Sequence, residues 1–298
     1  MSMNSKNILV GGVIVLIVIG ATSFLSQSTS TQEANQSKKL TSVSSITHGH
    51  GLAVDAKDSS KVYIATHHGL LVLLSDKDLF AVGSKQDDYM GFSKHPTDSN
   101  IFFSSGHPAT GGNIGFQKSE DGGFTWKKIS DGQSGPVDFH AMAVSLANPN
   151  LIYGWFRGAI QRSIDGGKSW EKFPTNFVVV NLAADPKDEN IVYAASPQGL
   201  MVSTDKGEQW NVLMDGFVST LAVNPKNSQS LISFSEKQRL AKSEDTGKTW
   251  TKISESFSGE TPLFLAFDSL QPDTIYTLTE KNSLYKSTDG ANNWKKIR

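Results

Sequence analysis

Short apolar segments separated by turn residues repeat along most of this chain. Each repeat starts with an apolar segment that ends in an Asp/Asn-Pro turn, such as Leu182-Ala183-Ala184-Asp185-Pro186. A second apolar segment follows, such as Ile191-Val192-Tyr193-Ala194, and two further segments flank a recurrent polar motif. Four short segments rich in β-branched and aromatic residues, with turns between them, predict one four-stranded antiparallel sheet per repeat.

The polar motif reads Ser-x-Asp-x-Gly-x-x-Trp and occurs five times, the last time with Ala291 in place of glycine. A sixth, degenerate repeat has Phe80 in the tryptophan column, and the six aromatic anchors are spaced 40 to 46 residues apart. A repeat of this length cannot bury its own apolar face and must pack against its neighbours. The sequence therefore predicts an all-β, six-bladed β-propeller of four-stranded antiparallel blades. The aspartates and tryptophans of the motif are Asp121, Trp126, Asp165, Trp170, Asp205, Trp210, Asp245, Trp250, Asp289 and Trp294.

The chemistry of this motif is that of a turn. Ser and Asp side chains accept hydrogen bonds from backbone N–H groups in turns, and glycine adopts positive φ at little cost. A tryptophan in the same motif supplies a large apolar surface for packing between sheets. We therefore predict a structural role for the five motifs, on the face opposite the ligand face, and we expect Ala291 to affect stability rather than activity.

The N-terminal region predicts a location. Residues 8–25 form a run of eighteen uncharged residues that reaches about 27 Å as a helix, close to the hydrocarbon thickness of a bilayer. Lys6 precedes the run and favours an N-terminus on the inside. We predict a signal anchor or transmembrane helix within residues 1–25, with a cleaved signal peptide and a buried core helix as alternatives.

The rest of the chain divides into two parts. Residues 26–45 are rich in Ser, Thr and Gln and predict a flexible tether, although residues 40–46 could instead add an edge strand to the first blade. Residues 46–298 form the predicted propeller. The domain would be held outside the cytoplasmic membrane by a single-pass anchor, or secreted if the segment is cleaved.

Charge and cysteine content exclude several classes of function. The formal net charge is −1, which offers no electrostatic basis for binding nucleic acid. The chain has no cysteine, which excludes disulfides, thiolate metal sites, a cysteine nucleophile and a lipoprotein anchor.

The histidines provide the strongest indication of a functional site. When the inner strands are aligned, His50 and His140 share one column with Met90, and His48, Asp88 and Asp138 share the column two residues earlier. Side chains two residues apart lie on the same face of a strand. The second strand returns antiparallel to the same end, so nine residues should gather on one face of blades 1–3, whereas His95 falls at the opposite end. The nine residues are His48, His50, His67, His68, Asp88, His107, Asp138, His140 and Arg157.

Imidazoles and carboxylates in one cavity are ligands for a transition metal such as Zn, Cu, Mn or Fe. We predict His48, His50, His107 and His140 as metal ligands, within a wider ligand-binding set that also includes His67, His68, Asp138 and Arg157. The alternative is a rim of solvated histidines that only shapes a pocket. This prediction depends on the strand register. Residues 111–113, on a glycine-rich connection, are predicted to lie on the same face and to act as a lid.

Asp88 and Asp138 also allow a catalytic interpretation. Two carboxyl groups about 6.5–9.5 Å apart can serve as general acid and general base in an inverting glycosidase. Two exposed aspartates on the rim of the pocket are the alternative. Nucleophilic Ser-His-Asp chemistry has no supporting Gly-x-Ser-x-Gly motif.

The repeated motif resembles the Asp box, or BNR repeat, of sialidases and sortilin-type propellers. The segments His48-Gly49-His50-Gly51-Leu52, Thr66-His67-His68-Gly69-Leu70 and Val137-Asp138-Phe139-His140 further resemble a group of prokaryotic Asp-box propellers. That group is labelled glycosyl hydrolase or exo-α-sialidase-like, within the sortilin (Vps10)-like propeller superfamily. The resemblance implies a glycan-processing role, but fold alone does not establish a reaction.

The residues argue against true sialidase chemistry. A sialidase-like site needs three arginines for a carboxylate, and this chain has only four arginines in total and no Arg-Ile-Pro segment. Photosystem II assembly factors also resemble this repeat, and they bind protein through arginine-rich pockets. Binding of a metal-dependent ligand is thus our leading prediction, with glycan hydrolysis second and protein binding third. The ligand itself, whether a small molecule, a glycan or a protein, is left open.

Overall fold

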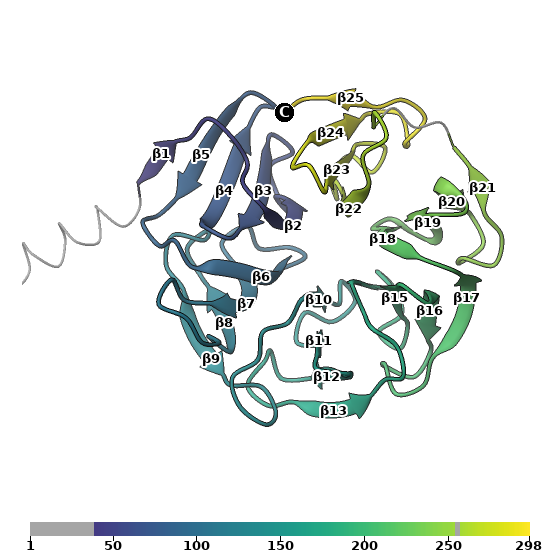
Figure 1. The fold of residues 1–298 in the computed structure, drawn as a ribbon, viewed down its shortest axis with the longest axis horizontal. Helices are drawn as coiled ribbons and strands as arrows, with labels where there is room; N and C mark the ends of the chain where they lie inside the picture. Colours follow the sequence, from purple (N-terminus) through teal and green to yellow (C-terminus); the bar gives the residue numbers. More distant parts are fainter. Residues whose placement is uncertain (1–38, 254–256) are drawn as a thin grey trace, which may run out of the picture.

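The six sheets of this protein are arranged in a ring around a central axis (Figure 1). The computed structural model describes residues 39–253 and 257–298, which form 25 strands. The prediction of a six-bladed propeller with four-stranded antiparallel blades is confirmed. Residues 8–25, the predicted membrane anchor, lie outside the described residues. The described residues contain no helix that is both long enough and apolar enough to span a membrane.

The strands follow the chain from the inner to the outer edge of each blade. Blade 1 contains β2 (Gly49–Val54), β3 (Lys61–Thr66), β4 (Gly69–Leu74) and β5 (Asp78–Val82). Blade 2 contains β6 (Asp88–Lys94), β7 (Phe102–His107), β8 (Phe116–Ser119) and β9 (Lys127–Ser130). Blade 3 contains β10 (Ala141–Val144), β11 (Ile152–Phe156), β12 (Ala159–Ser163) and β13 (Glu171–Pro174).

The second half of the ring repeats this order. Blade 4 contains β14 (Asn181–Ala184), β15 (Val192–Ser196), β16 (Gly199–Ser203) and β17 (Asn211–Asp215). Blade 5 contains β18 (Val218–Asn224), β19 (Asn227–Ser235), β20 (Arg239–Ser243) and β21 (Thr251–Lys252). Blade 6 contains β22 (Pro262–Phe267), β23 (Ile275–Thr279), β24 (Leu284–Ser287) and β25 (Lys295–Lys296).

The ring closes by packing and without exchange of strands between its first and last blades. Each blade is built from one continuous segment of chain, and β2 of blade 1 contacts β22 of blade 6. A fifth strand, β1 (Leu40–Ser42), pairs antiparallel with β5, with Leu40 opposite Val82. The expected edge strand is therefore present, inside the range that we assigned to the tether.

The hydrophobic core lies between neighbouring blades. Tyr63, Tyr153, Tyr193 and Tyr276 on the second strands are all buried. Trp126 of blade 2 stacks on Tyr89 with ring centroids 4.8 Å apart, and both join a cluster of side chains from blades 1 and 2. Large aromatic side chains bury about 150–250 Å² each, so this packing fixes the position of each blade relative to its neighbour.

The five Ser-x-Asp motifs form hydrogen-bonded turns between the third and fourth strands. In blade 3, Gly167 N donates to Ser163 Oγ at 2.8 Å, and Ser169 N donates to Asp165 Oδ1 at 2.9 Å. Trp170 Nε1 donates to Gly167 O at 3.1 Å, which anchors the indole over its own turn. Ala291 occupies the glycine position of blade 6 with φ of 74°, in the left-handed region that favours glycine.

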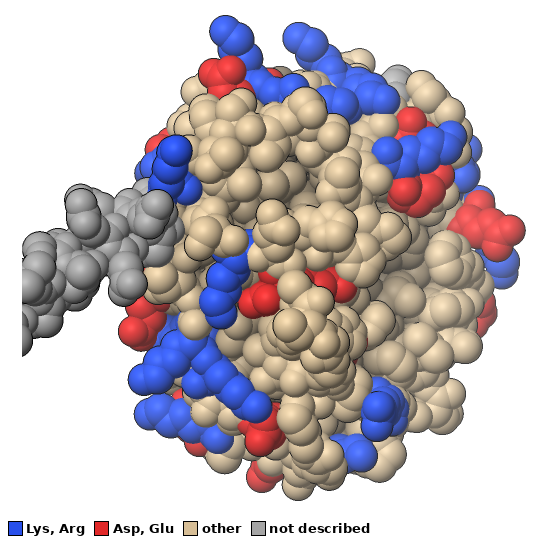
Figure 2. Space-filling model, turned by 60° about the vertical axis from the view of Figure 1, so that its left-hand side comes forward, with Lys and Arg blue, Asp and Glu red and all other residues tan. Residues whose placement is uncertain are grey.

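These turns lie at the opposite ends of the strands from the histidines. Strand β12 starts beside the hairpin that contains Arg157 and ends at Ser163, where the turn begins. On the outer side shown in Figure 2, charged groups of both signs are scattered over the blades.

Candidate functional site

A cavity of about 860 Å³ opens where the inner strands begin, on the face opposite the Ser-x-Asp turns. Its polar wall comes from blades 1–3, and its other wall is apolar and includes Val178 and Phe264. The side chains from blades 1–3 that line the cavity are those of His48, His50, His67, Met90, His107, Asn113, Asp138, His140, Trp155, Phe156 and Arg157.

Glycines on both sides of His50 allow this residue to enter the cavity. A Cβ at Gly49 would come within 2.3 Å of Leu278 in blade 6, and a Cβ at Gly51 would come within 2.8 Å of Phe92 in blade 2. The β2–β3 register also shifts between Gly49 and Gly51, which leaves His50 as the extra residue of a bulge. Bulges redirect side chains and are frequent beside functional sites. The close packing of blades 6, 1 and 2 thus fixes where this imidazole points.

Three imidazoles of blade 1 form a compact group. The ring centroids of His48, His50 and His67 lie 4.2 to 4.9 Å apart. His48 has φ of 47°, an uncommon backbone conformation for a residue with a side chain, and its carbonyl accepts a hydrogen bond from His67 N at 3.3 Å. Backbone strain of this kind is typical of binding sites, where the surrounding structure maintains it.

This group has the geometry of a metal site. One nitrogen from each of the three imidazoles lies within 4.8 Å of the other two. Burial, together with the neighbouring His67 and His48, lowers the pKa of His50 to about 3. His50 is therefore neutral at physiological pH, which is the form in which imidazole binds a metal.

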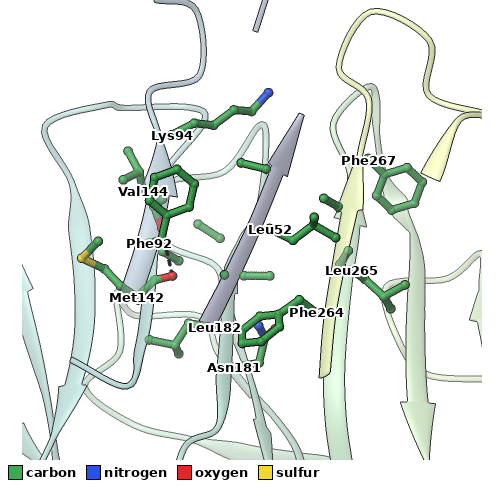
Figure 3. Close-up of a pocket in the computed structure, with 18 of the residues that line it drawn as sticks. Leu52, Phe92, Lys94, Met142, Val144, Asn181, Leu182, Phe264, Leu265 and Phe267 are labelled. Carbon is green, nitrogen blue, oxygen red and sulfur yellow. Dashed lines mark hydrogen bonds between the residues drawn. The ribbon is translucent and has the colours of Figure 1, made fainter. Parts of the chain in front are cut away.

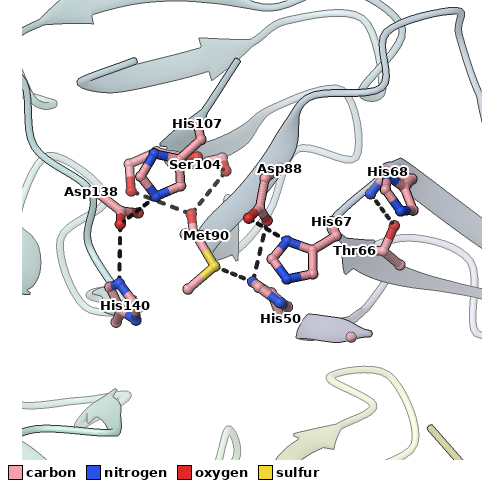
Figure 4. Close-up of polar contacts among 12 residues, drawn as sticks. His50, Thr66, His67, His68, Asp88, Met90, Ser104, His107, Asp138 and His140 are labelled. Atoms are coloured by element: carbon pink, nitrogen blue, oxygen red, sulfur yellow. Dashed lines mark hydrogen bonds and ion pairs between the residues drawn. The ribbon is translucent and has the colours of Figure 1, made fainter. Parts of the chain in front are cut away.

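Asp88 connects this group to blade 2. Its Oδ2 lies 2.5 Å from His67 Nδ1, and its Oδ1 lies 3.2 Å from His50 Nδ1 (Figure 4). The Sδ atom of Met90 also contacts His50 Nδ1. The hydrogen bond between His67 Nδ1 and Asp88 leaves Nε2 of that ring available for a metal, which is how many metal-binding histidines are oriented. Oδ1 of Asp88 is buried and makes no hydrogen bond with the described residues. Burial raises the pKa of Asp88, and the charge on His67 opposes this effect.

Asp138 holds a second pair of imidazoles. Its Oδ2 lies 2.9 Å from His107 Nε2 and 3.0 Å from His140 Nε2. Burial raises the pKa of Asp138, but the hydrogen bond to His140 and the charges on both imidazoles outweigh it, so the net shift is downward. The hydrogen bond to Asp138 raises the pKa of His140. Oδ1 of Asp138 is buried and accepts no hydrogen bond from the described residues.

The glycine-rich connection of blade 2 touches this second group. His107 Nδ1 lies 2.8 Å from the carbonyl oxygen of Gly112, and Asn113 Nδ2 donates to Pro136 O at 3.0 Å. Residues 111–113 therefore lie on the histidine face, where the sequence placed them.

The structure gathers most of the predicted residues but groups them differently. We expected His48, His50, His107 and His140 to form one metal set, whereas the compact imidazole group contains His67 and leaves His107 and His140 on Asp138. His68 is exposed, with its ring 6.3 Å from that of His67, and it does not line the cavity. His95 lies at the opposite end of its strand, where its Nδ1 accepts hydrogen bonds from Thr97 N and Asp98 N.

Sequence reasoning assigned no role to Met90 or to the aromatic residues Trp155 and Phe156, although all three line the cavity. The signal for Met90 was its position in the column of His50 and His140. Arg157, the only described arginine that lines this cavity, lies over the ring of Phe156 at 4.9 Å. The cavity thus lacks the three arginines that sialidase-like capture of a carboxylate needs.

Comparisons with known proteins support the fold. An ancestral GH74 enzyme superimposes with a TM-score of 0.60 and 16% identity over 87% of this chain and 40% of its own. The GH74 xyloglucanase from Xanthomonas campestris superimposes with a TM-score of 0.55 and 18% identity, over 82% of this chain and 45% of its own. YCF48 bound to D1 peptide superimposes with a TM-score of 0.55 and 16% identity, over 87% of this chain and 84% of its own. No protein-family model matches, and no curated protein matches by sequence.

These similarities define the class of protein and no more. The chain spans less than half the length of the GH74 enzymes that it matches, and at this identity the likeness extends to the fold alone. The chain is a six-bladed β-propeller with a compact group of three histidines at one mouth of its channel.

Proposed function

We propose that this protein binds a transition-metal ion through His48, His50 and His67, and that the bound ion takes part in recognising a ligand in the adjoining cavity. The observation that carries the proposal is the convergence of three imidazole nitrogens within 4.8 Å of one another, on a wall where the carboxylate of Asp88 is hydrogen-bonded to His67 and lies 3.2 Å from His50. Imidazole ligands suit Zn, Cu and Fe, and a carboxylate that is hydrogen-bonded to a ligating imidazole increases the basicity of that ring.

Metal analysis tests this proposal directly. Protein without a polyhistidine tag, incubated with Zn²⁺ or Cu²⁺ and then desalted, should retain about one ion per chain. The double variant His50→Ala/His67→Ala should lose the ion. His68→Gln is the matched control, because this exposed imidazole lies on the same hairpin as His67 and outside the group. Equal metal content in the double variant and the control would disprove the assignment.

We also propose that residues 8–25 tether the propeller outside the cytoplasmic membrane and that the chain belongs with the Asp-box propellers of the sortilin-like superfamily. The uncharged run of eighteen residues supports the first part, and the repeated hydrogen-bond pattern of the Ser-x-Asp turns supports the second. Membrane fractionation of the intact chain, with release into solution when residues 1–38 are deleted, tests the tether.

Glycan hydrolysis is the second candidate function. Asp88 and Asp138 are both buried on the histidine face, their pKa values shift in opposite directions, and a xyloglucanase is among the proteins with a similar fold. A carboxyl with a raised pKa beside one with a lowered pKa is the pattern of a general acid and its partner. Turnover of oligosaccharides that is lost in both Asp88→Asn and Asp138→Asn would establish it.

Protein binding is the third candidate. YCF48 bound to D1 peptide shares the fold, but among the described residues only one arginine, Arg157, lines the cavity of this chain. One arginine gives the cavity little positive charge with which to bind an anionic protein segment, so we favour a metal-dependent ligand over such a partner.

A further inference from the structure

A second cavity continues from the histidine cavity into the central channel. It encloses about 210 Å³, and His50, His140 and Phe264 line both spaces. An apolar cavity of about 150 Å³ is large enough to bind benzene. The channel therefore has room for part of a ligand whose other end lies among the histidines.

The walls of this channel are mainly apolar. Figure 3 shows Leu52, Phe92, Leu182 and Leu265 around it. Small residues on the inner strands, such as Gly51, Ala53, Ala143 and Ala183, leave the space between these larger side chains. The wall is formed by residues from all six blades.

Two polar side chains of the wall, Ser93 and Asn181, form hydrogen bonds with backbone groups. Ser93 Oγ donates to Met142 O at 3.1 Å, and Asn181 Oδ1 accepts from Leu221 N at 3.4 Å. Lys94 lies at one end of the view in Figure 3, with Phe264 and Asn181 at the other, and its Nζ is 3.4 Å from Ser269 Oγ. The channel thus presents an apolar section between the histidines at one mouth and an amine at the other.

We propose that the ligand of the metal site carries an unbranched apolar tail, which enters the central channel between His50 and Lys94 while an oxygen-donor head group meets the metal. This inference rests on the proposed function, because the metal positions the head group. It names the class of ligand as an amphiphile with a metal-binding head, such as an acyl hydroxamate or a carboxylate.

The apolar wall makes the affinity depend on tail length. Burial of each methylene group lowers the dissociation constant about three- to fourfold. The strand segment from His50 to Val54 rises about 13 Å at ~3.3 Å per residue, and this depth limits the length of tail that gains affinity. Beyond it the tail meets the polar end of the channel at Lys94 and Ser269.

Alkyl hydroxamates of increasing length test the inference. Metal-loaded, full-length protein is titrated with acetohydroxamate, butanohydroxamate and octanohydroxamate by calorimetry. We expect the affinity to rise at least tenfold from the acetyl to the butanoyl compound, to rise further toward the octanoyl compound, and to fall sharply in metal-free protein. Equal affinities along the series, with metal bound, would overturn the inference and leave the metal site intact.

Channel variants provide the control for non-specific apolar binding. Ala183→Phe and Ser93→Leu each fill space at a partly exposed channel position, and both should abolish the dependence on tail length while metal content and acetohydroxamate affinity stay unchanged. A length dependence that survives in folded, metal-loaded variants would also overturn the inference. Failure of the wild-type protein to bind metal at all would overturn the proposed function, and the inference with it.

Discussion

Asp88 on the inner strand of blade 2 lies 2.5 Å from Nδ1 of His67, on the hairpin that joins the second and third strands of blade 1. This contact crosses a blade boundary, and the same carboxylate also reaches His50. One buried aspartate therefore orients His67 and lies beside His50, and the packing of blade 1 against blade 2 determines the geometry of the site.

Replacement of Asp88 by Asn should weaken metal binding more than any other single change outside the three imidazoles. Asn keeps one oxygen that can accept from His67 Nδ1, but it places an NH₂ group opposite His50 Nδ1, where Asp88 has Oδ1 at 3.2 Å. Loss of an orienting carboxylate typically costs 10–100-fold in metal affinity. Competition with a chromophoric chelator measures the dissociation constant of Asp88→Asn against that of the wild type.

Asp138→Asn is the matched control for this change. Asp138 is buried on the same face but holds His107 and His140, which lie outside the three-histidine group. We expect its metal affinity to stay within about threefold of the wild type, well below the typical effect of losing an orienting carboxylate. Equal losses in the two variants would mean that both carboxylates act on one shared site.

Because of Lys94, the free energy of unfolding should rise with pH in the alkaline range. Burial lowers the pKa of this amine to about 8, and Asp55 and Asp268 oppose the shift only in part. Below pH 8 the amine is charged in both the folded and the unfolded chain, so the folded state carries the full cost of burying the charge. Between pH 8 and about 10.5 the unfolded chain binds more protons, and the free energy of unfolding rises with pH.

The variant Lys94→Met removes this cost. At pH 7 we expect it to be more stable than the wild type by no more than about 3 kcal/mol, with the difference shrinking toward zero near pH 10.5. Urea denaturation of both proteins at pH 7, 9 and 10 gives the two free energies, and comparison at each pH cancels the other groups that titrate. A constant difference across this range would show that the amine is well solvated.

The fold could be predicted from the sequence because its evidence is periodic. Trp126, Trp170 and the other anchors each pack in the same place, so their spacing gave the number of blades and their turns gave the strand connections. The aligned inner-strand columns also placed His50 and His140 at one mouth of the channel. Residues 1–38 lie outside the described part of the chain, so the anchor stays a prediction.

The grouping within the site could not be predicted in the same way. Columns identify the face on which a side chain lies, but the bulge at His50 and the left-handed backbone at His48 decide which imidazoles meet. His67 belongs to a hairpin turn, where strand alternation no longer indicates direction. It joins His48 and His50 because Asp88 of the next blade holds it, and this contact between blades has no signature in a single sequence.

Arg162 should contribute more to stability than the equivalent lysine of another blade. Its guanidinium contacts Glu171 and Glu208, and Nη1 donates to the carbonyl of Lys206 in blade 4 at 3.1 Å. The side chain is only 10% exposed. Hydrogen bonds from a charged group are worth about 1.5–3 kcal/mol each, so Arg162→Met should lower the free energy of unfolding by about 1–3 kcal/mol.

Lys242 supplies the comparison for Arg162. It also directly precedes the serine of its turn, but it is 34% exposed, and among the described residues its ion pair is with Glu244 on the surface. Exposed ion pairs contribute at most about 1 kcal/mol, and Lys242→Met should cost less than about 0.5 kcal/mol. Denaturant titration of both variants gives the two values, and equal costs would contradict a specific role for Arg162 between blades 3 and 4.

Two glycines at the same place in the repeated turn should differ in their tolerance of alanine. Gly167 and Gly207 have φ of 88° and 87°, so the backbone strain of an added side chain is the same at both. A Cβ at Gly167 would come within 1.9 Å of the Phe116 ring, whereas one at Gly207 would stay 3.5 Å from its nearest neighbours. Ala291 shows that this turn accepts alanine when space allows. Overpacking costs about 1–3 kcal/mol. Gly167→Ala should therefore lower the free energy of unfolding by that much more than Gly207→Ala does, as measured by urea denaturation. Equal losses would mean that backbone conformation alone selects glycine in these turns.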